Sequence, residues 1–155
     1  MIELKRMTEN EAINICDWQY EGEFKVYNFP KWDEAVEKGY GITKDNKRNL
    51  EFLSIYSGSQ LIGYGRISLN NNQIVLGIGI KPELCSKGYG NKAFKLLIEK
   101  ARTKSSKENI VLLVRSFNER AIKCYKNNNF IIINKFQYEM HGESVSFTKM
   151  LYVNR

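Results

Sequence analysis

Hydrophobic and polar positions in the middle of the chain follow the short period of β-strands. Strands are expected over residues 51–56 and 60–69, because the turn signal at 57–59 separates two apolar, strand-favouring runs. A third strand is expected over 73–80, after the asparagine turn 70–72, because asparagine tolerates left-handed backbone conformations. Together these segments predict an antiparallel meander.

A helical period replaces the strand pattern after the glycine-containing segment 85–90. Apolar residues then recur at i, i+3, i+4 and i+7, as on the buried face of a helix: Phe94, Leu97, Ile98 and Ala101. The continuous apolar run 110–114 is typical of a strand that is covered on both faces. Strands around crossover helices predict an α/β or α+β fold, with helices on the faces of the sheet.

The end of the chain is expected to form another helix and then a hairpin. Asn118 can cap a helix whose inner face would carry three residues: Ala121, Ile122 and Tyr125. The segments 130–139 and 144–153 are expected to pair through a turn at His141 and Gly142. His141 is therefore interpreted as a turn residue.

The N-terminal part combines a strand, a capped helix and an aromatic segment. A short strand is expected over 2–6, and Thr8 and Glu11 have capping-box spacing. The residues that continue at helical spacing are Ala12, Ile13, Cys16 and Tyr20. The aromatic-rich segment 17–40 predicts one or two short helices with loops, whose rings either pack in the core or line a binding pocket.

Length and composition favour an ordinary globular protein. The 155 residues suffice for one domain with its own core, so we expect a single domain over residues 1–155. Apolar residues make up 43% and charged residues 26%, which argues against disorder. No apolar run approaches the ~20 residues of a membrane helix, and the mixed charges at the N-terminus are unlike a secretory signal. We therefore expect no membrane partner.

Cysteine and histidine usage restricts the chemistry. The three cysteines, Cys16, Cys85 and Cys124, are sparse and odd in number, which indicates a reducing compartment, the cytoplasm. No two of the cysteines have CxxC spacing, which argues against a disulfide framework or a zinc site. Because His141 is the one histidine, a multi-histidine metal site is excluded, and no metal is expected.

The net charge of +7 and the pI of about 9.3 favour anionic partners. Nucleic acid is one alternative, and the longest basic stretch is 100–107. No aromatic residue interrupts this stretch, so it lacks the stacking platforms of single-strand binders. A phosphorylated ligand is the other alternative.

The segment that carries most of the chemistry is 74–93. Its strand has glycines at two alternate positions, Gly77 and Gly79, which indicates a bulge or a close approach by another backbone or a ligand. Pro82 then ends the strand, and the loop 85–90 leads directly into the helix. Free N–H groups at such a helix start can bind a pyrophosphate, to which Lys87 would add a full charge.

This segment resembles the acetyl-CoA motif of the GNAT superfamily of N-acetyltransferases. That motif is Arg or Gln, any two residues, Gly, any residue, then Gly or Ala. Gly88 and Gly90 match it, whereas Cys85 departs at the first position, which affects a side-chain role but no backbone role.

A second superfamily motif, Asn-x-x-Ala-x-x-x-Tyr-x-x-x-Gly-Phe, resembles residues 118–130. The residues that match are Asn118, Ala121, Tyr125 and Phe130. Asn129 replaces the usual glycine, a mild change if this position is a left-handed helix C-cap. The resemblance extends over nearly the whole chain in the order of its elements.

The resemblance implies a mixed, mostly antiparallel central sheet that is splayed between its fourth and fifth strands, with helices on both faces. The pantetheine arm of acetyl-CoA would lie in this opening and pair with the backbone of Ile78 and Ile80, and the loop 85–90 would hold the pyrophosphate. The residues implied to bind the cofactor are Ile78, Gly79, Ile80, Cys85, Ser86, Lys87, Gly88, Tyr89, Gly90, Asn118, Ala121 and Tyr125.

The implied reaction is direct attack of a primary amine on the acetyl carbonyl of acetyl-CoA. A strand N–H near residues 78–80 would stabilise the developing oxyanion. Tyr125 would hydrogen-bond or protonate the departing thiolate.

The general base is open, because residues 73–80 contain no Asp or Glu where many relatives have an acid. Glu21 is the first candidate, followed by Glu23 and Glu143. Water would suffice for an α-amine, since presenting it neutral at pH 7 costs about 1 kcal/mol, against ~4.6 kcal/mol for a lysine amine.

Two further alternatives stay open. The missing strand acid is compatible with a CoA-binding sensor or interaction module that has little catalytic activity. The acceptor of an active enzyme would be a small amine, a protein N-terminus or a lysine, and the resemblance is compatible with a homodimer. Cys85 would lie near a helix N-terminus and Lys87, which is expected to give its thiol greater thiolate character, so its oxidation is expected to block cofactor binding.

Overall fold

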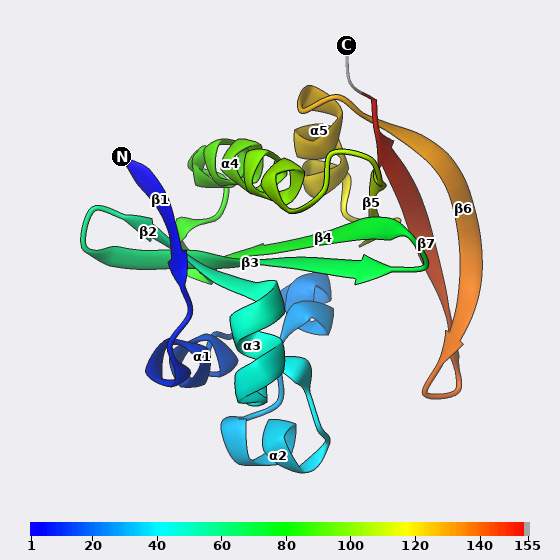
Figure 1. The fold of residues 1–155 in the computed structure, drawn as a ribbon. Helices are drawn as coiled ribbons and strands as arrows, with labels where there is room; N and C mark the ends of the chain where they lie inside the picture. The colour runs from blue at the N-terminus through cyan, green and yellow to red at the C-terminus, as the bar shows by residue number, and fades with distance from the viewer. Residues whose placement is uncertain (154–155) are drawn as a thin grey trace. The chain divides into compact units, whose positions relative to one another are not determined.

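The computed structural model describes residues 1–153 (Figure 1). Its helices are α1 (Glu9–Cys16), η1 (Gly22–Tyr27), α2 (Trp32–Glu37), η2 (Gly41–Thr43), α3 (Asp45–Glu51), η3 (Pro82–Leu84), α4 (Tyr89–Lys104) and α5 (Glu119–Asn127), of which the η elements are 3₁₀ helices. Its strands are β1 (Ile2–Arg6), β2 (Phe52–Ser57), β3 (Gln60–Asn70), β4 (Gln73–Ile80), β5 (Asn109–Arg115), β6 (Phe130–Met140) and β7 (Glu143–Tyr152).

The strands form a mixed sheet in the order β1-β2-β3-β4-β5-β7-β6. The pairs β1–β2, β2–β3, β5–β7 and β6–β7 are antiparallel, whereas β4 and β5 are parallel. This topology confirms the predicted mixed, mostly antiparallel α/β fold. No described helix is both long enough and apolar enough to cross a bilayer.

Internal contacts divide the chain into two compact units. Unit 1 comprises Met1–Arg66 and Ile78–Leu96, and unit 2 comprises Ile67–Gly77 and Leu97–Arg155. Two strands, β3 and β4, and the helix α4 each contribute residues to both units. The single domain over residues 1–155 stays a prediction.

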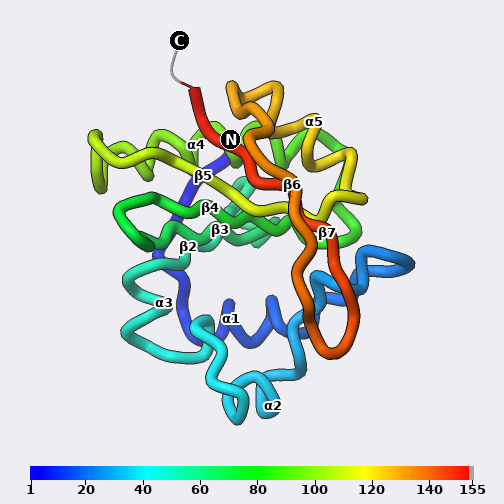
Figure 2. Tube along the Cα trace, turned by 90° about the vertical axis from the view of Figure 1, so that its right-hand side faces the viewer, coloured from blue at the N-terminus to red at the C-terminus, as the bar shows by residue number. Residues whose placement is uncertain are grey.

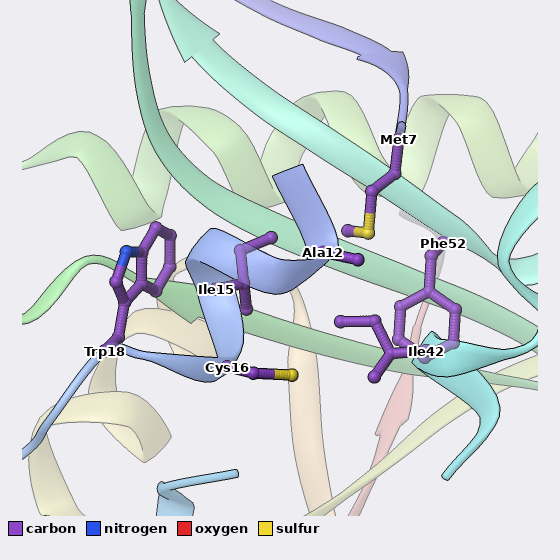
Figure 3. Close-up of a cluster of buried hydrophobic side chains, with 7 residues drawn as sticks. All are labelled: Met7, Ala12, Ile15, Cys16, Trp18, Ile42 and Phe52. Carbon is purple, nitrogen blue, oxygen red and sulfur yellow. The ribbon is translucent and has the colours of Figure 1, made fainter. Parts of the chain in front are cut away.

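One face of the strands in unit 1 carries a buried hydrophobic cluster that includes α1 (Figure 3). Its members are Met7, Ala12, Ile15, Cys16, Trp18, Ile42 and Phe52. The predicted capping box begins α1, because the Thr8 side chain accepts a hydrogen bond from the Glu11 N–H, and the Glu11 carboxylate accepts one from the Thr8 N–H. The cap orients α1 so that its apolar positions reach this cluster.

A second cluster in unit 1 joins β2 and β3 to the first half of α4 through Ile55, Ile62 and Ala93. A bulge makes this possible, because Ile55 pairs with Gly63 and Tyr56 pairs with Leu61, so that Ile62 is the extra residue. Leu61 and Tyr64, three positions apart, consequently both pack against the first cluster.

In unit 2, β6 and β7 form a long hairpin whose two strands run side by side in both views (Figures 1 and 2). Strand β7 also pairs with β5, from Val111↔Leu151 to Arg115↔Phe147. Strand β6 therefore forms the edge of the sheet.

The parallel ladder between β4 and β5 is short. It comprises Gln73↔Asn109, Ile74↔Ile110 and Val75↔Val111. In unit 2 both strands continue past this ladder, to Gly77 in β4 and Arg115 in β5, with no further pair between them among the residues described there. The fourth and fifth strands therefore separate where the resemblance implied a splay.

The turns follow the sequence closely. Asn71 and Asn72 have φ values of 51° and 62° in the β3–β4 turn, as expected for asparagine. Asn129 has a φ of 68°, which fits the predicted left-handed position after α5. His141, with a φ of 52°, lies in the β6–β7 turn as predicted.

Three expectations about elements are wrong in part. Helix α1 ends at Cys16, so Tyr20 is not on its face. Helix α3 was not expected: it occupies residues 45–50, for which the pattern predicts no element, and also Glu51, so that β2 begins at Phe52, one residue later than expected. The run 110–114 is not covered on both faces, because Leu113 is 50% exposed.

Candidate active site

Two glycines let β3, β4 and the Tyr64 ring approach one another closely in unit 1. A β-carbon on Gly79 would lie 2.7 Å from Cζ of Tyr64, and one on Gly63 would lie 2.5 Å from the carbonyl oxygen of Gly79. The alternating glycines of the sequence predicted a close approach by a backbone or a ligand. At Gly79 the approaching group is the protein's own tyrosine ring.

The direction of the β4 backbone follows from its last contact with β3. The Lys81 N–H donates to the Ile62 carbonyl at 2.8 Å, and the Gly79 carbonyl also faces Gly63 of β3. Because backbone groups alternate along a strand, those of Ile78 and Ile80 point away from β3. These are the two residues that the sequence analysis assigned to the pantetheine arm.

The Ile80 carbonyl at the end of β4 is already engaged. It accepts a hydrogen bond from the Tyr20 hydroxyl at 2.6 Å, and the Cys85 thiol lies at 3.6 Å from the same oxygen. A ligand that pairs with Ile80 would therefore use the N–H of this residue or displace Tyr20. Sequence reasoning missed Tyr20, because no local pattern connects residues 60 positions apart.

The loop after β4 has the backbone shape of an anion site. Ser86 and Gly88 adopt left-handed conformations, with φ values of 65° and 87°, directly before the first residue of α4, Tyr89. Space above Gly88 is open, since a β-carbon there would meet no atom within 4 Å. Such a loop before a helix N-terminus suits a pyrophosphate. Lys87 is exposed beside it.

Cys85 is held by the backbone of this loop. Its Sγ lies 3.6 Å from the Ile80 carbonyl oxygen and 3.7 Å from that of Lys81. Carbonyl oxygens can accept a hydrogen bond from a thiol and would repel a thiolate. This observation does not favour the reactive thiolate expected for Cys85, whose sensitivity to oxidation stays a prediction.

The segment that carries Glu21 forms a loop closed by Asn28. The Asn28 Oδ1 accepts from the Tyr20 N–H at 2.6 Å, and Asn28 Nδ2 donates to the Tyr20 carbonyl at 3.4 Å. Glu21 and Glu23 are exposed on this loop. The structure thus places Glu21 next to the residue that contacts the end of β4, and all of these residues lie in unit 1.

The other predicted site residues lie on α5 in unit 2. Asn118 is 8% exposed and caps the helix, accepting from the Ala121 N–H at 3.1 Å. Tyr125, two turns further, is partly buried with its ring centroid 6.3 Å from that of Phe130. Glu143, the remaining candidate base, is exposed at the start of β7. Among the described residues, no three His, Cys, Asp or Glu side chains are grouped to hold a metal ion.

The comparison with protein families decides the class of the protein. A model described as the acetyltransferase (GNAT) family matches residues 11–130. The chain belongs to this family. Membership confirms the predicted class, an N-acetyltransferase with acetyl-CoA as co-substrate. No curated protein matches the chain.

Solved structures agree with this family at the level of the fold. A chimera of the Vibrio cholerae spermidine N-acetyltransferase SpeG and hSSAT has a TM-score of 0.74 and 20% identity, covering 98% of this chain and 95% of its own. The ribosomal-protein-S18-alanine N-acetyltransferase of Escherichia coli has a TM-score of 0.68 and 13% identity, covering 98% and 93%. The GNAT protein described here shares their fold.

Proposed function

We propose that this GNAT protein transfers the acetyl group of acetyl-CoA to a primary amine by direct attack. The observation that carries the proposal is the backbone geometry at the end of β4. There, the backbone groups of Ile78 and Ile80 point away from β3, and the strand leads into a loop with two left-handed residues before α4. An amide-rich arm that ends in a diphosphate is complementary to both features.

The binding roles that we propose combine this geometry with those that the family resemblance implies. The backbone of residues 78–80 pairs with the pantetheine arm, and the loop 85–90 binds the pyrophosphate, assisted by Lys87. The Cys85 N–H donates to the Pro82 carbonyl, so the donors to the pyrophosphate come from the residues that follow Cys85. Asn118 and Ala121, at the start of α5, contact the pantetheine arm. The support for this fit is the open space at Gly88, where a β-carbon would meet no atom within 4 Å.

In the reaction, the nitrogen lone pair of the amine forms a bond to the acetyl carbon while the bond from that carbon to sulfur breaks. The nitrogen loses a proton, and the departing sulfur gains one or accepts a hydrogen bond. A backbone N–H near Ile78 donates to the carbonyl oxygen as negative charge develops. Tyr125 donates to the sulfur.

The role of Tyr125 is tested by the Tyr125→Phe variant, which keeps the ring against Phe130 and removes only the hydroxyl. We expect kcat to fall roughly 100-fold, because general acid catalysis contributes about 10²–10⁴-fold, while the Kd for acetyl-CoA stays unchanged. Release of free CoA thiol with a panel of amines measures the rate, and calorimetry measures the affinity. An unchanged kcat with correctly bound acetyl-CoA would remove Tyr125 from the mechanism.

Glu21 is proposed as the general base, and Glu23 offers a matched control on the same loop. We expect Glu21→Gln to lower kcat/KM and to flatten the acidic limb of its pH profile, whereas Glu23→Gln should leave both as in the wild type. If the wild type and both variants have the same pH profile, water rather than Glu21 accepts the proton of the amine. Binding of acetyl-CoA without transfer to any amine would instead indicate a CoA-binding module.

A further inference from the structure

One face of the sheet in unit 2 is open where β5 has passed the end of its ladder with β4. Leu113 lies on this part of β5, paired among the described residues with β7 alone, and half of its side chain is exposed. Its cross-strand neighbour is Lys149 of β7, which in turn pairs with Asn134 of β6. The same register places Arg115 beside Phe147, and Phe147 beside Phe136. We call these six residues the Leu113 face.

The opposite face of the same strands is closed. Its residues on β5 and β7 are Leu112, Val114, Thr148 and Met150, with exposures of 2%, 5%, 0% and 0%. Alternation along the strands separates these side chains from those of the Leu113 face. Contiguous apolar surface that is rimmed by polar residues marks ligand or partner sites, and here Leu113 is grouped with two phenylalanines and two cations.

The Leu113 face combines an aromatic platform with positive charge. The Phe136 and Phe147 rings stack with centroids 5.9 Å apart, and the Arg115 guanidinium lies 5.3 Å from the centroid of Phe147. Lys149 adds a second cation. The acids of β6 and β7, Glu139 and Glu143, lie at the hairpin end, and the segments 109–115, 131–138 and 145–152 that surround the two cations contain no Asp or Glu.

We propose that the Leu113 face receives the acetyl acceptor and selects an amine attached to an apolar or anionic body over a polycation. This inference rests on the proposed acetyl transfer and adds the class of acceptor to it. An acceptor carboxylate can pair with Lys149 or Arg115, while its apolar part covers Leu113 and the two rings. A polyamine would bring two or more positive charges to a surface that is itself positive.

Acceptor preference tests this directly. Three tripeptides with the same N-terminal and third residues carry Glu, Gln or Lys in the middle, and spermidine is the fourth acceptor. We expect kcat/KM to fall in the order Glu, Gln, Lys, with about fivefold or more between Glu and Lys, the range of a partly exposed ion pair. We expect spermidine to be a poorer acceptor than the Glu peptide.

A matched pair of variants locates the selectivity. Lys149→Glu changes the Leu113 face, whereas Lys135→Glu makes the same charge change on the opposite face, where Lys135 pairs with Thr148. Lys149→Glu should abolish or reverse the preference for the Glu peptide, and Lys135→Glu should keep it. Lys149→Gln should lower the preference without reversing it, which keeps the test decisive should Lys149→Glu fold poorly.

The outcomes separate this inference from the proposed function. If the wild type acetylates spermidine or the Lys peptide as well as the Glu peptide, the inference is wrong and acetyl transfer stands. If the two Lys→Glu variants shift the preference equally, overall charge rather than this face sets it, and the inference is also wrong. If no amine is acetylated although acetyl-CoA binds, the proposed function itself fails.

Discussion

Gly79 illustrates how a single residue can have a meaning that the sequence only half reveals. The alternating glycines of β4 pointed to a close approach, and the group that approaches is the Tyr64 ring. A periodicity argument cannot name this ring, because Tyr64 lies on another strand and reaches Gly79 only through the register of β3 and β4. The glycine's steric role could be predicted, but its partner could not.

We expect Gly79→Ala to destabilise the protein by roughly 1–3 kcal/mol, the usual cost of overpacking. The added β-carbon would lie 2.7 Å from Cζ of Tyr64, so the ring or the strand has to move. Gly90→Ala is the control, because its β-carbon would lie 3.7 Å from Ile80 Cγ1, an ordinary contact, and alanine favours a helix. Urea unfolding measures both variants, and equal stabilities would contradict the steric account.

Cys16 most clearly shows how burial makes the stability of the protein depend on pH. Burial raises the pKa of the Cys16 thiol from 9.0 to about 11, and the Asp17 charge adds to this shift. Burial likewise raises the pKa of Tyr64 from 10.0 to about 12, with a smaller contribution from Cys16. Both groups are therefore protonated in the folded protein at pH values where the unfolded chain has begun to lose these protons.

The consequence is a loss of stability on the alkaline side. The contribution of Cys16 is fully present below pH 9.0 and is lost as the pH rises toward about 11. We expect the free energy of unfolding of the wild type to fall more steeply over this range than that of Cys16→Ala, although the variant is less stable at neutral pH. Parallel pH dependences in urea titrations would show that Cys16 does not titrate differently in the two states.

At the scale of elements, local sequence signals predicted where helices begin better than where they end. The capping box at Thr8 and the Asn118 cap each begin a helix where the sequence placed them. The end of α1 was missed, because helical spacing continues to Tyr20 in the sequence. The Tyr20 backbone bonds instead to the Asn28 side chain, and its hydroxyl bonds to the Ile80 carbonyl. Long-range hydrogen bonds of this kind have no local signature.

We therefore expect the protection of the loop from Tyr20 to Asn28 against hydrogen exchange to depend on the Tyr20 hydroxyl. Tyr20→Phe removes the 2.6 Å hydrogen bond to Ile80, which is worth about 0.5–1.5 kcal/mol. We predict faster hydrogen exchange in residues 22–27 and a higher KM for the amine, with the stability of β6 and β7 unchanged. Tyr138→Phe, on an exposed residue of β6, is the control. Exchange in the loop that is as slow as in the wild type would show that Asn28 alone holds it.

At the scale of the whole molecule, the order of elements and the mixed sheet could be predicted because two motifs at the right spacing identify the fold. The exposure of Leu113 could not. A run of five apolar residues reads as covered on both faces, and only the cross-strand register shows that one of them faces an open surface. In the sequence, an exposed apolar residue within a strand looks the same as a core residue, since both are apolar.

The central claim is that the end of β4 and the loop 85–90 bind acetyl-CoA through their backbone. Amide hydrogen exchange with and without saturating acetyl-CoA tests it most directly, because it reports on these N–H groups themselves. The account predicts slower exchange in residues 78–80 and 85–90 and unchanged exchange in the β6–β7 turn at 141–142. Unchanged exchange in both of the first two segments, with acetyl-CoA bound, would contradict it.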